Sequence, residues 1–268
     1  MIILNSKKFK AFLTASFDGG SRYPGSRIAP GVFLQWQSQY NPNLLREFII
    51  NEIPIKNQNP HFAMDLIREY IKDSLGQNKF NILFGGDHSI TVPSVEAFLQ
   101  FYNGKANIII FDAHDDFDGS QNTLMNWNIL NYLLKMNVNI FLFGVRLPTP
   151  ELYNYSNLKI YSSLGEHEIK ENLFHKLDDH LDIELPTYIS LDLDVFNLYE
   201  FPGVSNGEPG GMSFNEIIKW LNYIFSKYNV KFIDIVEFNP TVEKEVSLKT
   251  LNTLFILINR MINTDESF

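Results

Sequence analysis

Three short motifs contain side chains that commonly bind metal ions, and each follows a short hydrophobic segment. In chain order, the motifs are GGDHS at 85–89, DAHDD at 112–116 and DLD at 192–194. Short apolar segments of this kind are typical of buried β-strands, so we predict that each motif lies where a strand ends. Histidines and aspartates that converge from neighbouring strand ends favour a metal site. The candidate ligands are His88, Asp112, His114, Asp116, Asp192 and Asp194.

This ligand set favours two Mn²⁺ ions per chain, with other divalent metals as alternatives. It combines carboxylate oxygens with imidazole nitrogens, and the chain has no cysteine that could add a thiolate. Four carboxylates would balance two divalent cations, and bridging aspartates would let six side chains serve both. A water that bridges two such cations loses a proton near neutral pH and becomes a nucleophile. The expected reaction is therefore hydrolysis.

The spacing within the motifs predicts which side chains face the same way. Side chains alternate between the two faces of a strand, so we expect Asp112, His114 and Asp116 to project together. The same argument places the two aspartates of DLD together. Asp87 and Asp115 are out of phase with these ligands, and we expect them to have a structural role or to orient a ligand.

Hydrophobic segments alternate with amphipathic ones along the chain, which predicts an α/β fold with a mostly parallel sheet covered on both faces. Ligands of such a sheet bind beyond the carboxyl ends of its strands, where the three motifs fall. No change in composition marks a linker, so residues 1–268 are predicted to form a single domain. The predicted strands are 9–16, 80–84, 106–112, 139–144, 158–161, 187–193 and 231–237. The predicted helices are roughly 60–76, 92–102, 125–136, 165–182, 213–227 and 243–262.

Composition limits the classes of partner. Of 268 residues, 45% are hydrophobic and 20% are charged, which is typical of an ordered globular enzyme. The net charge of −9 argues against nucleic acid, because phosphate binding needs a basic face. No segment approaches the roughly 20 apolar residues of a membrane span, and the first residues lack the features of a signal peptide. We therefore expect a cytoplasmic enzyme that binds neither nucleic acid nor membrane.

The chain resembles the ureohydrolase superfamily of arginase, agmatinase and formimidoylglutamase. The three motifs, a PGGMS loop at 209–213 and an EFNP motif at 237–240 follow that family's order over nearly the whole chain. The resemblance implies a three-layer α/β/α sandwich, two Mn²⁺ ions and a homo-oligomer, either a trimer or a hexamer. It also implies a small-molecule amidine or guanidine substrate, whose C–N bond is cleaved through a metal-bridging hydroxide.

The same resemblance implies a role for each site residue. Asp116 would accept the proton released during the attack, and Glu237 would bind the cationic amidine or guanidine through paired N–H donors. The first metal would be bound by His88, Asp112, Asp116 and Asp192. The second metal would be bound by His114, Asp112, Asp192 and Asp194.

The chain departs from the family pattern at Asn126, which we align with the histidine that shuttles protons to the leaving amine in arginases and agmatinases. An asparagine cannot act as a general acid near neutral pH, a role that typically contributes about 10²–10⁴-fold. Formimidoylglutamases also lack this histidine. The departure therefore slightly favours a formimidoylglutamase-like or undefined amidine substrate over arginine, and it leaves agmatine open.

Substrates of this family differ in what the far end of the molecule carries. A dicarboxylate needs arginine near the pocket, because a buried unpaired carboxylate is costly. Arg22, Arg27 and Arg146 are the candidates for this role. Asp118 and Asn126 are further candidate substrate contacts.

Two other functional classes stay open from the sequence. One is a non-catalytic homologue that has lost the shuttle histidine and keeps its metals for stability or binding. The retention of all the ligands and Glu237 argues against it, since folding does not require such a cluster of like charge. The other class is a metal-dependent deacetylase or phosphatase.

Overall fold

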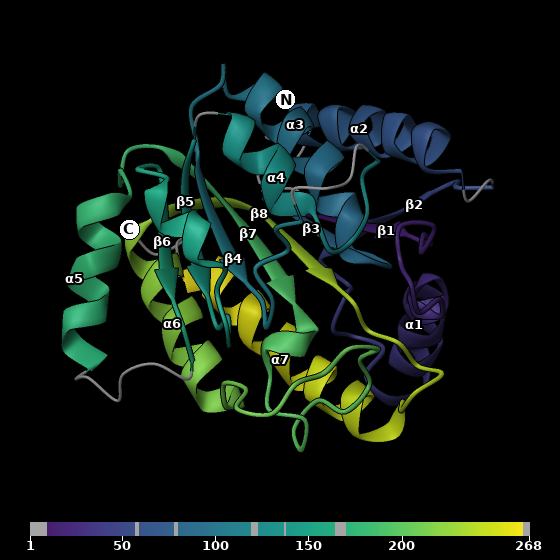
Figure 1. Cartoon of the computed structure of the whole chain (residues 1–268). Helices are drawn as coiled ribbons and strands as arrows, with labels where there is room; N and C mark the ends of the chain where they lie inside the picture. Colours follow the sequence, from purple (N-terminus) through teal and green to yellow (C-terminus); the bar gives the residue numbers. More distant parts are fainter. Residues whose placement is uncertain are drawn as a thin grey trace.

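A single sheet of eight parallel strands forms the centre of the molecule (Figure 1). The computed structural model describes residues 10–56, 59–77, 80–118, 123–136, 138–163 and 170–264. The strand order is β2-β1-β3-β8-β7-β4-β5-β6. The strands are β1 (Lys10–Ala15), β2 (Phe48–Ile53), β3 (Phe80–Phe84), β4 (Asn107–Phe111), β5 (Asn139–Phe143), β6 (Leu158–Tyr161), β7 (Pro186–Asp192) and β8 (Asn229–Val236). The helices are α1 (Ala29–Tyr40), α2 (Pro60–Gln77), α3 (Thr91–Phe101), α4 (Ile129–Leu133), α5 (Lys170–His180), α6 (Phe214–Lys227) and α7 (Glu245–Thr264).

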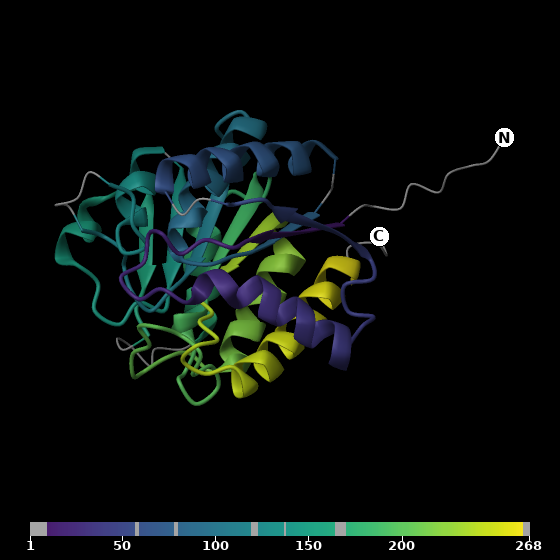
Figure 2. The ribbon, with the colours of Figure 1, turned by 90° about the vertical axis from the view of Figure 1, so that its right-hand side faces the viewer.

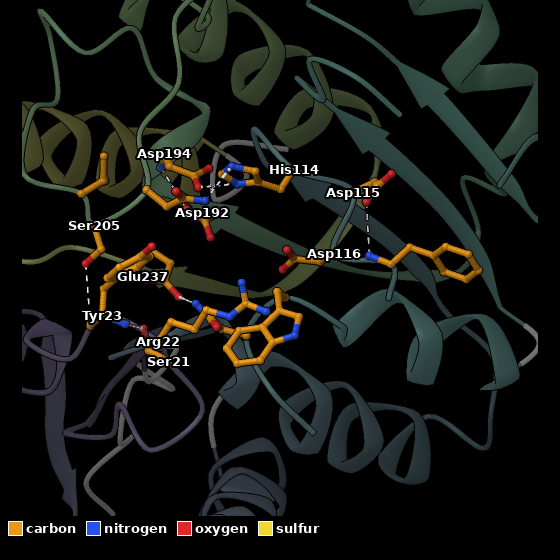
Figure 3. A pocket seen from close by; sticks show the side chains of 15 residues that line it. Ser21, Arg22, Tyr23, His114, Asp115, Asp116, Asp192, Asp194, Ser205 and Glu237 are labelled. Carbon is orange, nitrogen blue, oxygen red and sulfur yellow. Dashed lines mark hydrogen bonds and ion pairs between the residues drawn. The ribbon is translucent and has the colours of Figure 1, made fainter. Parts of the chain in front are cut away.

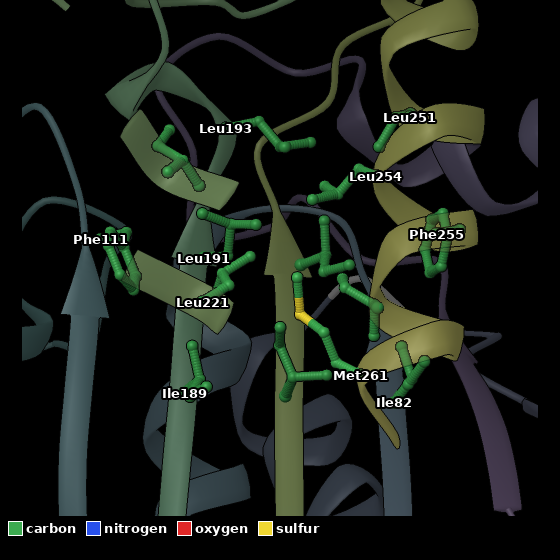
Figure 4. Close-up of a cluster of buried hydrophobic side chains, with 14 of the residues drawn as sticks. Ile82, Phe111, Ile189, Leu191, Leu193, Leu221, Leu251, Leu254, Phe255 and Met261 are labelled. Carbon is green, nitrogen blue, oxygen red and sulfur yellow. The ribbon is translucent and has the colours of Figure 1, made fainter. Parts of the chain in front are cut away.

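Helices cover both faces of this sheet, which confirms the three-layer α/β/α sandwich (Figures 1 and 2). On β3, Phe80, Ile82 and Phe84 belong to the core beneath α1, α5, α6 and α7, whereas Leu83 belongs to the core beneath α2, α3 and α4. This alternation follows from the pleat of the strand. Figure 4 shows the first core where strands meet α6 and α7. Within the described residues, no helix is both long and apolar enough to cross a membrane.

The sequence predicts most element boundaries closely. The predicted bounds of β3 and β6 agree with the structure at both ends, and the other predicted strands differ by one or two residues. Phe9, at the start of one predicted strand, lies outside the described residues, as do positions 165–169 of a predicted helix. The helix predicted at 125–136 begins only at Ile129, because the preceding residues line the site described below.

Two elements, α1 and β2, have no counterpart in the sequence prediction. Helix α1 contains Gly31 and several glutamines, and it buries few side chains, so its apolar periodicity is weak. Strand β2 lies at the edge of the sheet, and the four residues between Phe48 and Ile53 are exposed. Neither segment therefore has the buried apolar pattern that reveals an element in a sequence.

Gly86 allows the chain after β3 to pass against the loop after β1. A β-carbon at this position would lie 1.5 Å from the carbonyl oxygen of Phe17, which is backbone and has no flexible end that could move away. The same carbonyl accepts a hydrogen bond from the amide of Asp87 at 2.9 Å. The Gly86 carbonyl in turn accepts from the amide of Glu237 at 2.8 Å. A side chain at 86 would therefore disturb three loops at once.

We predict that Gly86→Ala lowers the free energy of unfolding by about 3 kcal/mol, because the backbone must shift to admit the methyl group. Gly31→Ala is the matched control, since nothing lies within 4 Å of a β-carbon at that position of α1. The control should stabilise the protein by about 0.5–1 kcal/mol. Chemical denaturation followed by circular dichroism measures both, and equal effects of the two variants would contradict the prediction.

Candidate metal centre and substrate cavity

The candidate ligands come from loops at the carboxyl ends of three central strands. Strands β3, β8, β7 and β4 are neighbours in the sheet. His88 follows β3, Asp112 follows β4 and Asp192 ends β7, so one edge of the sheet brings them together. Glu237 follows β8, between the others. This is the place where an open parallel sheet binds its ligands.

One group of ligands surrounds the Nδ1 atom of His88. This nitrogen lies 3.1 Å from Oδ2 of Asp112, 3.1 Å from Oδ2 of Asp116 and 3.2 Å from Oδ2 of Asp192. His88, Asp112 and Asp116 offer ligand atoms that lie within 4.8 Å of one another. The first predicted ligand set is therefore assembled around one point.

The second group shares Asp112 with the first. His114 Nδ1 lies 2.8 Å from Oδ2 of Asp194 and 3.6 Å from Oδ1 of Asp112. These three residues also offer ligand atoms within 4.8 Å of one another. Asp112 therefore presents Oδ2 to one group and Oδ1 to the other, as a bridging carboxylate does. Asp192 lies beside the first group, and its Oδ1 accepts the amide of Asp194 at 2.9 Å.

The alternation of side chains along a strand is not what brings the ligands of DAHDD together, so that part of the sequence argument is wrong. Strand β4 ends at Phe111, and the chain turns directly after it, with the His114 amide donating to Asp112 Oδ1 at 2.7 Å. Asp116 then has a φ of 45°, in the left-handed region. His114 and Asp116 consequently point to different groups (Figure 3).

Burial and crowding of like charges shift the pKa values in the cluster. Burial and the neighbouring carboxylates raise the pKa of Asp192 well above its usual range, and burial with Asp112 beside it raises the pKa of Asp116 to about 7. Burial lowers the pKa of His114, but Asp112 and Asp194 outweigh that effect and raise it to about 12. The raised pKa values mean that side chains of the cluster itself hold protons near neutral pH. Such a buried set of oxygen and nitrogen donors fits divalent cations, which supply positive charge in place of the protons.

We predict that Mn²⁺ binding releases protons, and that the apparent affinity rises between about pH 6 and pH 8. His114, with a raised pKa of about 12, is protonated over this range and must lose its proton to bind a metal. Acid therefore favours the metal-free protein. Titration calorimetry in buffers with different ionisation enthalpies measures the proton release directly. Affinity that is independent of pH, without proton release, would show that the cations bind elsewhere.

A buried network behind His88 fixes the orientation of its ring. His88 Nε2 lies 3.0 Å from Oγ of Ser190, and that hydroxyl donates to Oδ1 of Asp234 at 2.6 Å. Thr91 donates to the other oxygen of Asp234 at 2.8 Å, and the Tyr188 hydroxyl also donates to it. With the proton on Nε2, Nδ1 presents its lone pair to the cluster. The sequence signal for this network is a polar residue between two apolar ones, Ser190 within Ile-Ser-Leu of β7 and Asp234 within Ile-Asp-Ile of β8.

We predict that Ser190→Ala weakens metal binding about 10- to 100-fold, because the His88 ring loses the acceptor that orients it. Ser163→Ala is the matched control, since its hydroxyl donates to the Gly144 carbonyl rather than contacting a histidine. Mn²⁺ titration of both variants is the measurement. If the two variants bind Mn²⁺ equally well, the network does not act through the metal site.

Asp87 and Asp115 hold loops rather than ligands. Asp87 Oδ2 accepts the amide of Gly20 at 2.7 Å, and its other oxygen accepts from Ser89. Asp115 Oδ2 accepts the amide of Thr149 at 2.6 Å. The structural role that the sequence indicates for both residues agrees with these contacts.

Next to the cluster lies a cavity of about 280 Å³ (Figure 3). Glu237 lines it, and its Oε1 accepts from the amide of His88 at 2.7 Å and from Nδ2 of Asn126 at 3.0 Å. Burial raises the pKa of Glu237 to about 6, and these two donors counter part of that shift. The lining residues are Ser21, Arg22, Tyr23, His114, Asp115, Asp116, Phe117, Asn126, Trp127, Asp192, Asp194, Val204, Ser205, Asn206 and Glu237.

The other candidate substrate contacts separate into two groups. Asn126 and Arg22 line the cavity, and the buried Oδ1 of Asn126 has no hydrogen-bond partner among the described residues. Asp118 and Arg27 do not line it. Arg146 is buried elsewhere, where its guanidinium donates to the carbonyl oxygens of Gly144 at 3.0 Å, Asp194 at 3.1 Å and Val195 at 3.2 Å. In this structure Arg146 therefore supports the loop after β7.

Comparison with known proteins shows which family this sequence matches. A model of the Arginase family matches residues 10–258. An agmatinase of Bacillus subtilis (strain 168) is 29% identical over 263 residues, which cover 93% of this chain and 87% of the relative. An N(1)-aminopropylagmatine ureohydrolase of Thermococcus kodakarensis is 27% identical over 239 residues, covering 84% and 81%.

Solved structures share the fold. The crystal structure of a putative agmatinase from Clostridium difficile superposes with a TM-score of 0.81 and 23% sequence identity. The superposition covers 98% of this chain and 100% of that one.

Proposed function

The chain belongs to the arginase family, and from that premise we propose that it is a binuclear metal hydrolase that cleaves a C–N bond in a linear amidine or guanidine. One observation carries the proposal. Two groups of metal ligands share Asp112, and both face the cavity in which Glu237 is buried. A pair of cations beside a carboxylate that binds a cationic group is the arrangement such a reaction needs.

The geometry supports three ligands of each set and places Asp192 beside the first, and the sharing of Asp192 between both cations follows the family resemblance. His88, Asp112, Asp116 and Asp192 would hold one cation, and the second would be held by His114, Asp112, Asp192 and Asp194. Mn²⁺ is the proposed metal, because carboxylates dominate the donor set. When bound, the two cations would supply an attacking water that ionises near neutral pH.

The chain's own residues would place and deprotonate the reactants. Glu237 binds the amidinium or guanidinium through its paired N–H groups. Asn126 holds Glu237 in position through Nδ2, and its buried Oδ1 has no hydrogen-bond partner among the described residues. Asp116 lines the same cavity and accepts the proton that the attacking water loses.

The leaving amine also needs a proton. Among the described residues that line the cavity, His114 is the one histidine, and it belongs to the ligand set. Asn126 cannot act as a general acid. We therefore propose that Asp116 passes the proton it has accepted to the leaving nitrogen. A cytoplasmic location and assembly into a trimer or hexamer are further proposals, which rest on family resemblance.

The alternative is a non-catalytic homologue that keeps its metals, and Glu237→Gln separates the two. In a hydrolase this variant should bind Mn²⁺ normally but lose at least about 100-fold in kcat/KM, because a neutral amide no longer pairs with the cationic substrate. The exposed Glu151→Gln is the control. Turnover of guanidines and formimidoyl amines by Mn²⁺-loaded protein is assayed through urea, ammonia and formamide. If the wild-type protein binds two metal ions but hydrolyses none of these guanidines and formimidoyl amines, the result would favour the non-catalytic homologue.

A further inference from the structure

Arg22 lines the cavity and stacks on an aromatic ring. Its guanidinium lies over the indole of Trp127, 4.4 Å from the ring centroid, and both residues line the cavity (Figure 3). Within the part of the chain that the structure describes, the Arg22 side chain makes no ion pair and no hydrogen bond. Stacking fixes the plane of the guanidinium and leaves its N–H donors available to a ligand.

The loop that carries Arg22 is held on both sides. The Gly20 amide donates to Asp87 Oδ2 at 2.7 Å, and the Gly20 carbonyl accepts the amide of Asn126 at 3.0 Å. Further along, the Gly25 amide donates to Asp18 Oδ2 at 2.7 Å. These contacts tie Arg22 to the loop that follows β3 and to the segment that contains Trp127. The arginine is thus positioned before a ligand arrives.

The charges that line the cavity leave Arg22 without a counterion. Among the described lining residues it is the one lysine or arginine. Asp115 is turned to backbone amides, with Oδ2 on Thr149 at 2.6 Å and Oδ1 on Phe117 at 3.2 Å. The other lining aspartates belong to the metal cluster, and Glu237 is assigned to the substrate's cationic end. Once the cations and that end are in place, Arg22 is the one remaining positive charge among the described lining residues, and the negative charge of Asp115 stays on backbone amides.

We propose that Arg22, braced on Trp127, binds a carboxylate at the far end of the substrate. The substrate class is then an amidino or guanidino carboxylic acid, with its cationic group on Glu237 and its anionic group on Arg22. A guanidinium matches a carboxylate through two parallel N–H donors. A substrate with a cationic far end would meet a like charge. The assignment rests on the function proposed above and specifies its substrate.

The test uses three guanidines of equal chain length, which differ in the charge at the far end: 4-guanidinobutanoate, butylguanidine and agmatine. Mn²⁺-loaded wild-type protein should prefer 4-guanidinobutanoate over butylguanidine by about 10- to 100-fold in kcat/KM, mostly through KM. Arg22→Gln should remove that preference, because KM rises far more for 4-guanidinobutanoate than for butylguanidine. Arg22→Glu should reverse the preference in favour of agmatine.

Arg27→Gln is the matched control, because Arg27 lies in the same segment, is exposed and does not line the cavity. It should keep the wild-type preference. Added salt should weaken the preference, because Arg22 is exposed to solvent. A wild-type preference for agmatine, or a preference for the carboxylate that survives Arg22→Gln, would overturn the assignment.

Binding of the same three compounds, measured by calorimetry, separates this assignment from the proposed function. If none is hydrolysed but the carboxylate binds best, and only when Arg22 is present, the carboxylate site stands and the hydrolase proposal fails. If turnover occurs without any preference for the carboxylate, the hydrolase proposal stands and Arg22 has no part in specificity. Failure of all three compounds to bind or react overturns the carboxylate assignment, and the hydrolase proposal falls as well if the formimidoyl amines are not hydrolysed either.

Discussion

The carboxylates at the edge of the sheet bury several like charges together, and most of the site compensates for that electrostatic cost. Asp112, Asp192 and Asp194 are almost fully buried, and two buried histidine and aspartate groups overlap at Asp112. Buried like charges are costly unless hydrogen bonds, protons or cations compensate them. The backbone amides of the turns after β4 and β7 supply part of that compensation. Burial and the neighbouring carboxylates still raise the pKa values of Asp116 and Asp192, and divalent cations held by this cluster would complete the balance.

The parallel sheet makes this concentration of charge possible. Every strand ends at the same edge, so the loops after β3, β8, β7 and β4 meet although they are far apart in the chain. These loops can approach closely because Gly86 has no side chain and because backbone hydrogen bonds join them. Gly86 lets the loop after β3 lie against the Phe17 carbonyl, and its own carbonyl receives the amide of Glu237. The metal cluster and the carboxylate for the substrate are thus held by one set of backbone contacts.

The sequence predicts the sandwich, most strand ends and the candidate ligands, because buried parallel strands are continuous apolar runs with the ligands directly after them. It does not predict α1 or β2, which bury too little to have a periodic pattern. The turn after β4 depends on a left-handed Asp116, which strand periodicity cannot show. The sequence also cannot show which arginine contacts the substrate, because only the folded loops place Arg22 in the cavity and Arg146 against backbone carbonyls. Side-chain networks such as Ser190 with Asp234 depend on strand pairing, which is known only from the fold.

Backbone strain and buried charge coincide at the two residues to which chemistry is assigned. Asp116 and Glu237 both have positive φ, at 45° and 67°, which costs of order 1 kcal/mol or more for a residue with a side chain. Both carboxyls also have pKa values raised by burial, so the fold bears an electrostatic cost at the same positions. Glycine at either position would remove the backbone strain, and an apolar residue would remove the cost of burying a carboxylate. A protein that used this site only to hold metals would gain from both changes at Glu237, which is not a ligand, but it would still need Asp116 as one. The costs are understandable where a proton must be accepted and a cationic substrate held, which favours catalysis over a purely structural metal site.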